Sequence, residues 1–537
     1  MDREGHLWTL LVRWGVGIIL AACAVALLVT LSHLVGDWTA WLQYPFPRPG
    51  SEGLILYESL LVKHGGSPYA PITPQQFISG PYPPVYYWLA AATLPDRLPD
   101  FSQVGHISSL FMAGRLISLM AAFIAAVLMV PLAIFEGGYN RLGRRASLIA
   151  GLGGLFAGGL FLTLPEVTVW ATRFRGDMLM IALTAAGLTC TAIATRGAEQ
   201  ARWAWLIAAA AFFTLAFFTK QTALAGPIAA GVYLLLREPR VGLKWVGLMG
   251  LFVLLPFGAL DLLTGQWFYL KMVTYHSLPL RSLTLWRLLQ FGLWEDQWPL
   301  VVASLSFAIV RLSFLAKAAK ERSPGWQKRT TTLAPIFLLA TIATLPTGAI
   351  VGADHNHLLM SGLALGFVMA SLLARLLVEL GQRVIDRWFF IAAPAAAALV
   401  ALYLLVTAQP SSFYNPDLQM PRPEVAEQLR KIVLNISLNP GKLFFADDPG
   451  LLALAGKETP YDDPFTMTAL AQEGRWDEQT YRDMLRQGSF SLLVLSCAVY
   501  ETPTHCRADV FTPGVLDAIR SGYKLLYEDV LITYKPK

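Results

Sequence analysis

The sequence predicts a polytopic α-helical membrane protein that carries a soluble α/β domain after its last span. Of its 537 residues, 55% are hydrophobic and only 15% are charged, and the mean hydropathy is +0.50. Apolar runs of about 18 or more residues, long enough to cross a bilayer, recur as far as about residue 408. Beyond that point, short apolar runs alternate with helical patterns. These features exclude a soluble enzyme.

The first apolar span, about residues 11–35, follows Arg3 and Arg13, which place the N-terminus in the cytoplasm. This run is too long for the apolar region of a signal peptide, and no small-residue cleavage site follows it. The span therefore delivers a long first loop, residues 36–106, to the external side. Residues 85–95 are apolar but too short to cross, which predicts a re-entrant or interfacial segment.

Clusters of Arg and Lys mark the cytoplasmic ends of the later spans, because cytoplasmic loops carry an excess of these residues. The basic loops lie at 141–145, 196–202, 237–244, 317–329 and 383–387. The spans between them are expected at about 107–135, 147–165, 177–195, 243–263, 298–316, 332–350, 358–378 and 388–407, with two more that meet externally at Lys220-Gln221. The total is about eleven transmembrane helices, so the two termini lie on opposite sides.

Charge separates the two predicted domains, a transmembrane domain over 1–409 and an extracytoplasmic α/β domain over 410–537. The first carries 29 basic and 19 acidic residues and the second 13 and 17. The second domain has expected helices at 424–438, 477–486 and 514–520, and strands at 443–446, 490–496 and 524–534. Cys497 and Cys506 lie outside the cytoplasm in this topology, so a disulfide and two free thiols both remain open.

Every polar cluster that could carry chemistry falls on the external face of this topology. The clusters are Glu52, Arg175-Gly176-Asp177, Lys220-Gln221, His276 and Asp354-His355-Asn356-His357. Ionisable groups at membrane depth are costly and normally face a cavity or a partner. The sequence therefore predicts that these clusters form one site.

Glu52 is the candidate catalytic residue. A carboxylate at the external surface could deprotonate an acceptor hydroxyl as it attacks the anomeric carbon of a polyprenyl-phosphate-linked sugar. The phosphate leaving group needs positive charge rather than a general acid. Candidates for that charge are Lys63, Arg115, Arg173, Arg175 and Lys220. The alternative for Glu52 is a solvated loop carboxylate.

The other clusters also have simple structural interpretations. Asp177 suits the N-terminus of a helix, paired with Arg173 or Arg175, and Lys220-Gln221 suits an interfacial turn with a snorkelling lysine. His355 and His357 are two residues apart, a spacing that does not place both on one helix face. No third ligand is apparent, so a substrate-binding loop is favoured over a metal site.

Four aromatic residues close the first loop, and they are most simply an interfacial aromatic belt. They are Tyr82, Tyr86, Tyr87 and Trp88. Stacking of a sugar on one of them is the alternative.

These motifs together resemble the GT-C superfamily, which contains protein O-mannosyltransferases and bacterial aminoarabinose transferases. The resemblance runs over about residues 10–408 and rests on the order of the motifs 44–47, 51–53, 82–88, 172–177, 219–221 and 352–357. It implies a GT-C fold, a polyprenyl-phosphate sugar donor, Glu52 at the catalytic position, and transfer without a metal or other cofactor. The tail resembles the periplasmic domain that many members carry.

The remaining candidate site residues are divided between the two substrates. Donor binding is expected of Lys63, Tyr82, Arg115, Arg175, Asp177, Lys220 and Gln221. Acceptor or substrate binding is assigned to His276, Asp354, His355, Asn356 and His357. The enzyme would be a hexosyl- or pentosyltransferase of the cell (inner or plasma) membrane, with inversion and retention both open.

Two other functions compete with this one. A lipid or polysaccharide transporter would normally show internal repeats and charges at the bilayer midplane, and neither is found. An oligosaccharide ligase would use a similar scaffold with a preassembled glycan. The expected partners are the polyprenyl-phosphate sugar and membrane lipids, and no nucleic-acid motif is present. The sugar, the acceptor and the oligomeric state are not disclosed by the sequence.

Overall fold

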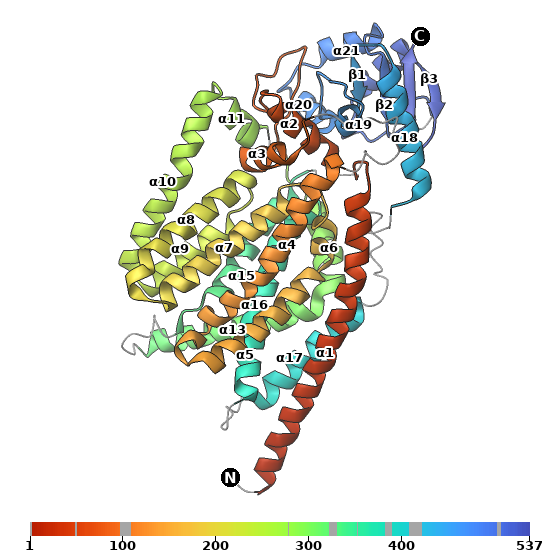
Figure 1. Cartoon of the computed structure of the whole chain (residues 1–537). Coiled ribbons are helices and arrows are strands. Elements are labelled where there is room, and N and C mark those ends of the chain that lie inside the picture. Colours follow the sequence, from red (N-terminus) through yellow and green to blue (C-terminus); the bar gives the residue numbers. More distant parts are fainter. Residues whose placement is uncertain are drawn as a thin grey trace.

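The computed structural model shows a long helical bundle with a small α/β domain at one end (Figure 1). The N-terminal end of α1 lies at the opposite end of the molecule. The described residues are 3–48, 51–96, 109–275, 277, 279–321, 330–351, 353–381, 389–407, 421–501 and 506–537.

Within the described residues, eight helices are long and apolar enough to cross a membrane, and three shorter apolar helices accompany them. The long ones are α1 (Arg3–Gln43), α4 (Ser109–Glu136), α5 (Arg144–Leu162), α7 (Asp177–Arg196), α8 (Arg202–Thr219), α10 (Pro239–Leu263), α13 (Asp296–Lys320) and α16 (Leu359–Leu380). The shorter ones are α9 (Ala225–Arg237), α15 (Leu333–Thr344) and α17 (Phe389–Thr407). Each predicted span corresponds to one of these helices, and the predicted fold class is confirmed.

Small residues let the central helices approach closely. Gly154 and Gly158 lie four apart on one face of α5, where a Cβ would come within 2.5 Å of Met129 O and 2.3 Å of Ala126 O on α4. Apolar side chains gain little by leaving lipid, so close backbone packing of this kind is a main source of helix association in membranes.

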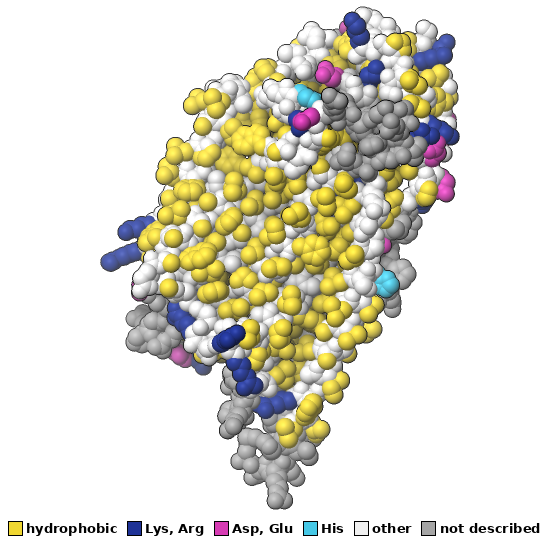
Figure 2. Space-filling model, viewed as in Figure 1, with side chains coloured by type: hydrophobic (Ala, Val, Ile, Leu, Met, Phe, Trp, Pro, Cys, Tyr) yellow, Lys and Arg dark blue, Asp and Glu magenta, His cyan; other side chains and the backbone are white. Residues whose placement is uncertain are grey.

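The outside of the bundle is apolar, as a lipid-facing surface requires. Figure 2 shows a broad hydrophobic surface along the bundle, with Lys and Arg concentrated towards its ends. The outermost helix, α10, exposes large side chains such as Leu254, Leu255 and Leu262. The chain is therefore an integral membrane protein.

The first loop is shorter and more ordered than the sequence predicts. Helix α1 continues to Gln43, and the loop contains two further helices, α2 (Glu52–Lys63) and α3 (Pro84–Thr93). Glu52, expected in an irregular loop, is the first residue of α2. The apolar segment expected at 85–95 is α3, which is ten residues long.

The segment 264–297, between the spans expected at 243–263 and 298–316, is also largely helical. It contains α11 (Trp267–Tyr269), η3 (Leu270–Thr274), α12 (Ser282–Arg287) and η4 (Leu288–Glu295), the last running directly into α13. Both η3 and η4 are π-helical. Their wider turn obscures the 3.6-residue period on which recognition of a helix from sequence depends.

Five short segments complete the bundle. They are η1 (Tyr139–Arg141), α6 (Pro165–Trp170), η2 (Glu199–Ala201), η5 (Leu345–Ala349) and η6 (His355–Leu358).

The tail is an α/β domain, as predicted, built on a four-stranded sheet of order β1-β2-β4-β3. Strands β1 (Phe444–Ala446) and β2 (Leu492–Leu495) are parallel, and β4 (Ile532–Pro536) pairs antiparallel with both β2 and β3 (Tyr523–Glu528). The single strand expected at 524–534 is therefore a hairpin. The helices are α18 (Pro423–Leu438), α19 (Pro449–Leu454), α20 (Pro464–Gln472), α21 (Gln479–Arg486) and α22 (Pro513–Gly522).

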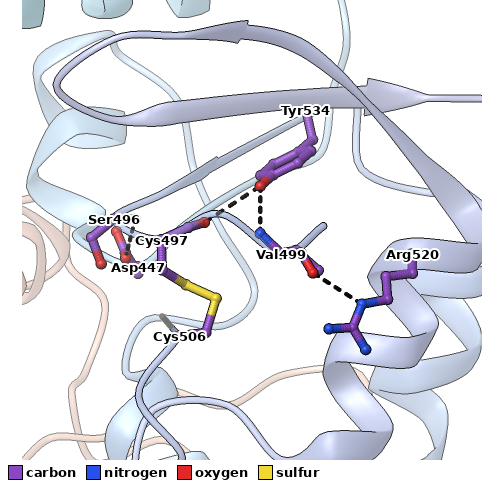
Figure 3. The surroundings of a disulfide bond; sticks show 7 residues. All are labelled: Asp447, Ser496, Cys497, Val499, Cys506, Arg520 and Tyr534. Carbon is purple, nitrogen blue, oxygen red and sulfur yellow. Dashed lines mark hydrogen bonds between the residues drawn. A yellow bond between two sulfur atoms is a disulfide. The ribbon is translucent and has the colours of Figure 1, made fainter. Parts of the chain in front are cut away.

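Cys497 and Cys506 form a disulfide, which settles the question that the sequence left open (Figure 3). Beside it, the Tyr534 hydroxyl accepts a hydrogen bond from Val499 N at 2.8 Å, and Arg520 Nε donates to Val499 O at 2.9 Å. The disulfide joins the residues just after β2 to the segment before α22. The boundary between the two predicted domains falls within 408–420, outside the described residues, so that division remains a prediction.

The tail domain packs directly on the first loop. Gly53 on α2 and Gly450 on α19 touch so closely that a Cβ on Gly450 would lie 2.4 Å from Gly53 Cα. Nearby, the Tyr57 hydroxyl donates to Thr459 O at 2.9 Å. Residues of the loop and of the tail domain therefore share one apolar core.

We predict that Gly450→Ala loosens this contact. The added methyl group meets backbone rather than a movable side chain, and overpacking of this kind typically costs about 1–3 kcal/mol. The measurement is thermal unfolding of the purified protein in detergent, with Gly36→Ala as the control, because a Cβ at Gly36 meets nothing within 4 Å. If Gly450→Ala unfolds at the same temperature as wild type, the close contact between Gly450 and Gly53 is contradicted.

Candidate functional site

Glu52 is completely buried and accepts four hydrogen bonds. Arg115 on α4 binds both of its oxygens, with Nε 2.8 Å from Oε1 and an Nη 2.6 Å from Oε2. The backbone N–H of Arg48 donates to Oε2 at 2.7 Å, and that of Phe174 donates to Oε1 at 2.6 Å. The carboxylate thus joins α2, α4 and two connecting segments.

This environment keeps Glu52 ionised. Burial raises its pKa, but the charge and hydrogen bonds of Arg115 and the nearby charge of Arg48 outweigh burial, so the pKa lies below its usual value. A carboxylate held in this way is a weak proton acceptor. Acting as a base would require Glu52 to give up one of these hydrogen bonds, so its catalytic role remains a prediction.

Arg115 and Lys63, both predicted to bind the donor, are held by groups of the protein itself. Besides Glu52, the Arg115 guanidinium donates to the carbonyl oxygens of Trp41, Tyr44 and Phe46. Lys63, at the far end of α2, donates to Leu94 O at 2.7 Å and pairs with Asp96 at 2.9 Å. In this structure both cations serve contacts within the first loop and its neighbours.

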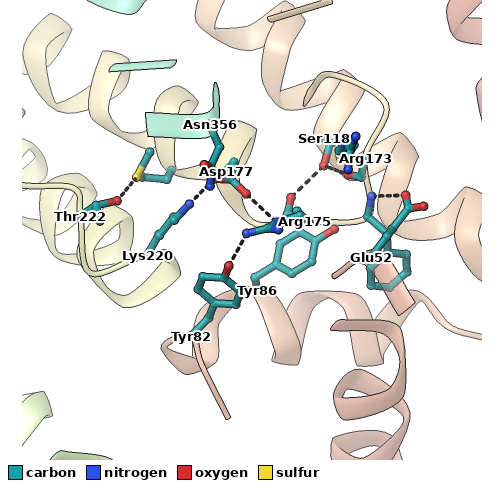
Figure 4. Close-up of polar contacts among 12 residues, drawn as sticks. Glu52, Tyr82, Tyr86, Ser118, Arg173, Arg175, Asp177, Lys220, Thr222 and Asn356 are labelled. Carbon is teal, nitrogen blue, oxygen red and sulfur yellow. Dashed lines mark hydrogen bonds and ion pairs between the residues drawn. The ribbon is translucent and has the colours of Figure 1, made fainter. Parts of the chain in front are cut away.

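A second charged centre surrounds Asp177, at the N-terminus of α7 (Figure 4). Its carboxylate pairs with Arg175 at 3.1 Å and with Lys220 from the turn after α8, and it accepts from Asn356 Nδ2 at 3.0 Å. Arg175 also donates to the Tyr82 hydroxyl. Residues from four distant segments therefore meet, as the sequence predicts.

Within contact distance, this centre carries a surplus of positive charge. Two buried cations, Arg175 and Lys220, pair with the single carboxylate of Asp177, and the charge of Asp354 acts on both from further away. The Lys220 ammonium also lies over the Tyr82 ring, 5.6 Å from its centroid. A buried site with surplus cations is suited to an anion.

A small cavity lies against this centre. Its lining consists of Ile55, Tyr82, Tyr86, Tyr87, Gly176, Asp177, Thr219 and Lys220. A Cβ at Gly176 would lie 3.1 Å from both Tyr86 and Thr219, so a larger residue there would require these side chains to shift.

The predicted aromatic belt is only partly present. Tyr86 and Tyr87 are buried, and with Tyr82 they line the cavity, whereas Trp88 is 55% exposed. The period of α3 explains this division, since residues 86 and 87 face the core and residue 88 faces away.

In the predicted substrate loop, residues 354–357, some side chains stabilise the loop itself and others reach the Asp177 centre or a second cavity. Asp354 caps η6 by accepting from His355 N at 2.7 Å, and it also contacts His355 Nδ1 at 2.8 Å. Asn356 reaches Asp177, and His357 lines a second cavity. Gln221 donates to Pro81 O at 3.3 Å. His276 lies outside the described residues.

Metal binding is not indicated by the arrangement of these side chains. Within the part of the chain that the structure describes, no group of three or more His, Cys, Asp or Glu side chains is placed to hold a metal ion. Metal-independent chemistry nevertheless remains an expectation from the sequence.

Comparison with known proteins agrees with this architecture. Residues 104–260, from just before α4 to near the end of α10, match the family model described as dolichyl-phosphate-mannose-protein mannosyltransferase. ArnT from Cupriavidus metallidurans, solved bound to undecaprenyl phosphate, aligns with a TM-score of 0.53 and 14% identity over 94% of this chain and 97% of its own. The resemblance to the GT-C superfamily is confirmed.

Another solved structure, the Archaeoglobus fulgidus oligosaccharyltransferase tethered to an acceptor peptide, aligns less well. Its TM-score is 0.47 at 12% identity, over 95% of this chain and 74% of that one. No curated protein matches the sequence. The GT-C fold of this chain therefore rests on the ArnT alignment and the family model.

Sequence reasoning missed several residues that border this site. Glu58 lies behind the cavity wall, where it accepts a hydrogen bond from the Tyr87 hydroxyl. Arg48 donates its backbone N–H to Glu52, and Asp462 reaches the same region from the tail domain. Glu58 lies six residues after Glu52 on a helix that was not predicted, so no sequence period indicated it.

We predict that Glu52→Gln lowers stability as well as activity. The substitution leaves the Arg115 guanidinium buried without its counter-charge, and breaking a buried ion pair in this way typically costs about 3–5 kcal/mol. Thermal unfolding measures the effect. The control is Glu427→Gln, which removes an exposed ion pair with Arg430 and should change little. Unchanged stability with loss of sugar transfer would instead support the catalytic role of Glu52.

Proposed function

We propose that this chain transfers a sugar from a polyprenyl-phosphate-linked donor to an acceptor on the extracytoplasmic side of the membrane. In the reaction, the bond between the anomeric carbon and the phosphate oxygen breaks, and its electron pair leaves with the phosphate. A new bond forms between the anomeric carbon and the acceptor oxygen, and the acceptor proton passes to a base.

The observation that carries this proposal is the surplus positive charge beside the aromatic cavity. Lys220 and Arg175 border the cavity or contact its lining, and both are almost fully buried. Cations fixed in a water-poor site stabilise the charge that develops on a departing phosphate, without reorganising during the reaction. The tyrosines of the same cavity offer flat apolar faces to a sugar or to the first isoprene units.

The similar proteins support the same class of donor. The ArnT structure was solved with undecaprenyl phosphate, and the matching family model is described by a dolichyl-phosphate sugar. Both ligands combine a long isoprenoid chain with one phosphate group. The lipid-facing bundle and the buried cations at its tail-domain end are suited to the two parts of such a molecule.

Glu52 remains the base that the sequence predicts. It begins the helix whose next turn supplies Ile55 to the cavity wall. In the present arrangement its first effect is on geometry, because it fixes the backbone of Phe174, which immediately precedes Arg175. Through that segment Glu52 supports the anion site even without accepting a proton.

We predict that Lys220→Gln lowers kcat/KM for transfer by about 10²-fold or more, because it removes a charge that opposes the departing phosphate. The assay uses purified protein and a panel of polyprenyl-phosphate sugars. Lys524→Gln is the matched control, since Lys524 is an exposed residue of β3.

The panel also tests the proposal as a whole. Consumption of no donor by wild-type protein would overturn it. Transfer by Lys220→Gln at the wild-type rate would show that the anion site lies elsewhere.

A further inference from the structure

Two carboxyl groups from distant parts of the chain meet beneath the cavity. Glu58 belongs to α2, and Asp462 belongs to the tail domain, just before α20. Both side chains are buried and act on each other electrostatically, and Ser79 bridges them: its backbone N–H donates to Asp462 at 2.9 Å and its hydroxyl donates to Glu58 at 3.2 Å. Two buried carboxyl groups this close together cannot both ionise without a large cost, so at least one of them carries a proton.

Glu58 holds the wall of the cavity in place. It accepts from the Tyr87 hydroxyl, from Gly80 N at 2.7 Å and from the Ser79 hydroxyl at 3.2 Å. Tyr87 lines the cavity, and Gly80 lies two residues before Tyr82, which also lines it. A change at Glu58 therefore acts on two of the cavity's three tyrosines.

The backbone of the tail domain hydrogen-bonds to the backbone of the first loop at Phe77. Phe77 N donates to Pro460 O at 2.7 Å, and Asp462 N donates to Phe77 O at 3.2 Å. The side chain of Asp462 then accepts from Ser79 N at 2.9 Å. Residues 77–79 thus pair with the tail domain like a short parallel strand.

We propose that Asp462 of the tail domain is a positioning residue of the site, which acts through a proton shared with Glu58 to fix residues 77–82 and Tyr87. This inference rests on the proposed function. If Asp462 has this role, the tail domain helps to shape the site at which transfer takes place. The substrate contacts remain those of the cavity lining.

The electrostatics of the pair give this support a dependence on pH. Burial raises the pKa of Glu58 to about 7, and burial with the neighbouring Glu58 charge raises that of Asp462 well above its usual range. A raised carboxyl pKa means that the contact is strongest at acidic pH and is lost as the pH rises through the folded-state value. The support should therefore weaken above about pH 7.

No other titratable group described around Glu58 and Asp462 takes over the role of the proton between the two carboxyl groups. Lys271 lies near enough to favour the charged carboxylates, but its ammonium already donates to Pro68 O at 2.7 Å and Ile78 O at 2.6 Å. Asp463 opposes ionisation of Asp462. The phenols that face the pair have raised pKa values and stay neutral; they are Tyr57, Tyr69, Tyr82 and Tyr87.

The test compares the pH dependence of transfer in Asp462→Asn, Asp462→Ala and wild type. Asparagine keeps an acceptor for Ser79 and offers Glu58 a donor that does not titrate. We expect the decline of wild-type activity above about pH 7 to be absent or displaced upwards in Asp462→Asn. Asp462→Ala should lose about tenfold or more at every pH, because small displacements of substrate-positioning groups are costly. Asp517→Asn, an exposed change in the same domain, is the control.

A second measurement does not depend on turnover. Hydrogen exchange of residues 74–82, compared between wild type and Asp462→Asn at each pH, should show protection that falls with pH only in wild type. Glu58→Gln should behave like Asp462→Asn, because it also removes the shared proton.

The two measurements separate this inference from the proposed function. Identical pH profiles and identical exchange in wild type and Asp462→Asn would overturn the inference. Failure of every protein to use any donor, with the pH-dependent protection present, would refute the proposed function and leave the coupling between Asp462 and Glu58 supported.

Discussion

The buried ion pair between Glu52 and Arg115 is the constraint on which the rest of the candidate site depends. The pair fixes the start of α2 against α4 and ties down the backbone on either side of it. One of the groups it holds is the N–H of Phe174, next to Arg175. Separating these charges in an apolar interior is costly, so the pair specifies one arrangement of the first loop.

Two further features build on this frame. The first is the centre at Asp177, where Arg175 and Lys220 leave a surplus of positive charge beside an aromatic cavity. The second is the contact between Glu58 of α2 and Asp462 of the tail domain. The helix that begins with Glu52 therefore links the membrane bundle, the anion site and the tail domain. Its twelve residues carry contacts to all three.

The sequence predicted what depends on local composition. Hydropathy located the eleven apolar helices of the described residues, and the distribution of Arg and Lys predicted that the clusters around Glu52, Asp177, Lys220 and Asn356 lie on one side. Asp177, Lys220 and Asn356 do meet, whereas Glu52 forms a separate centre with Arg115 that is joined to them through Phe174, and His276 lies outside the described residues. The π-helical segments and the helix α2 were missed because their apolar residues follow no clear 3.6-residue period.

Long-range partners could not be predicted in the same way. Nothing in the sequence connects Glu58 with Asp462, which lies about 400 residues later, and the hydrogen-bond saturation of Glu52 is visible only once Arg48 and Phe174 are placed. The burial of Tyr86 and Tyr87 likewise follows from the way α3 packs. Their aromatic character alone indicated a membrane interface.

The most direct test of this account is to locate a polyprenyl phosphate on the protein. A photoreactive undecaprenyl phosphate, labelled next to its phosphate group, would be crosslinked in detergent, and the modified residues would be identified by mass spectrometry. The account predicts labelling around Tyr82 and Lys220, competed away by unlabelled undecaprenyl phosphate. Labelling confined to the basic loop at Arg141–Arg145, at the far end of the bundle, would contradict it.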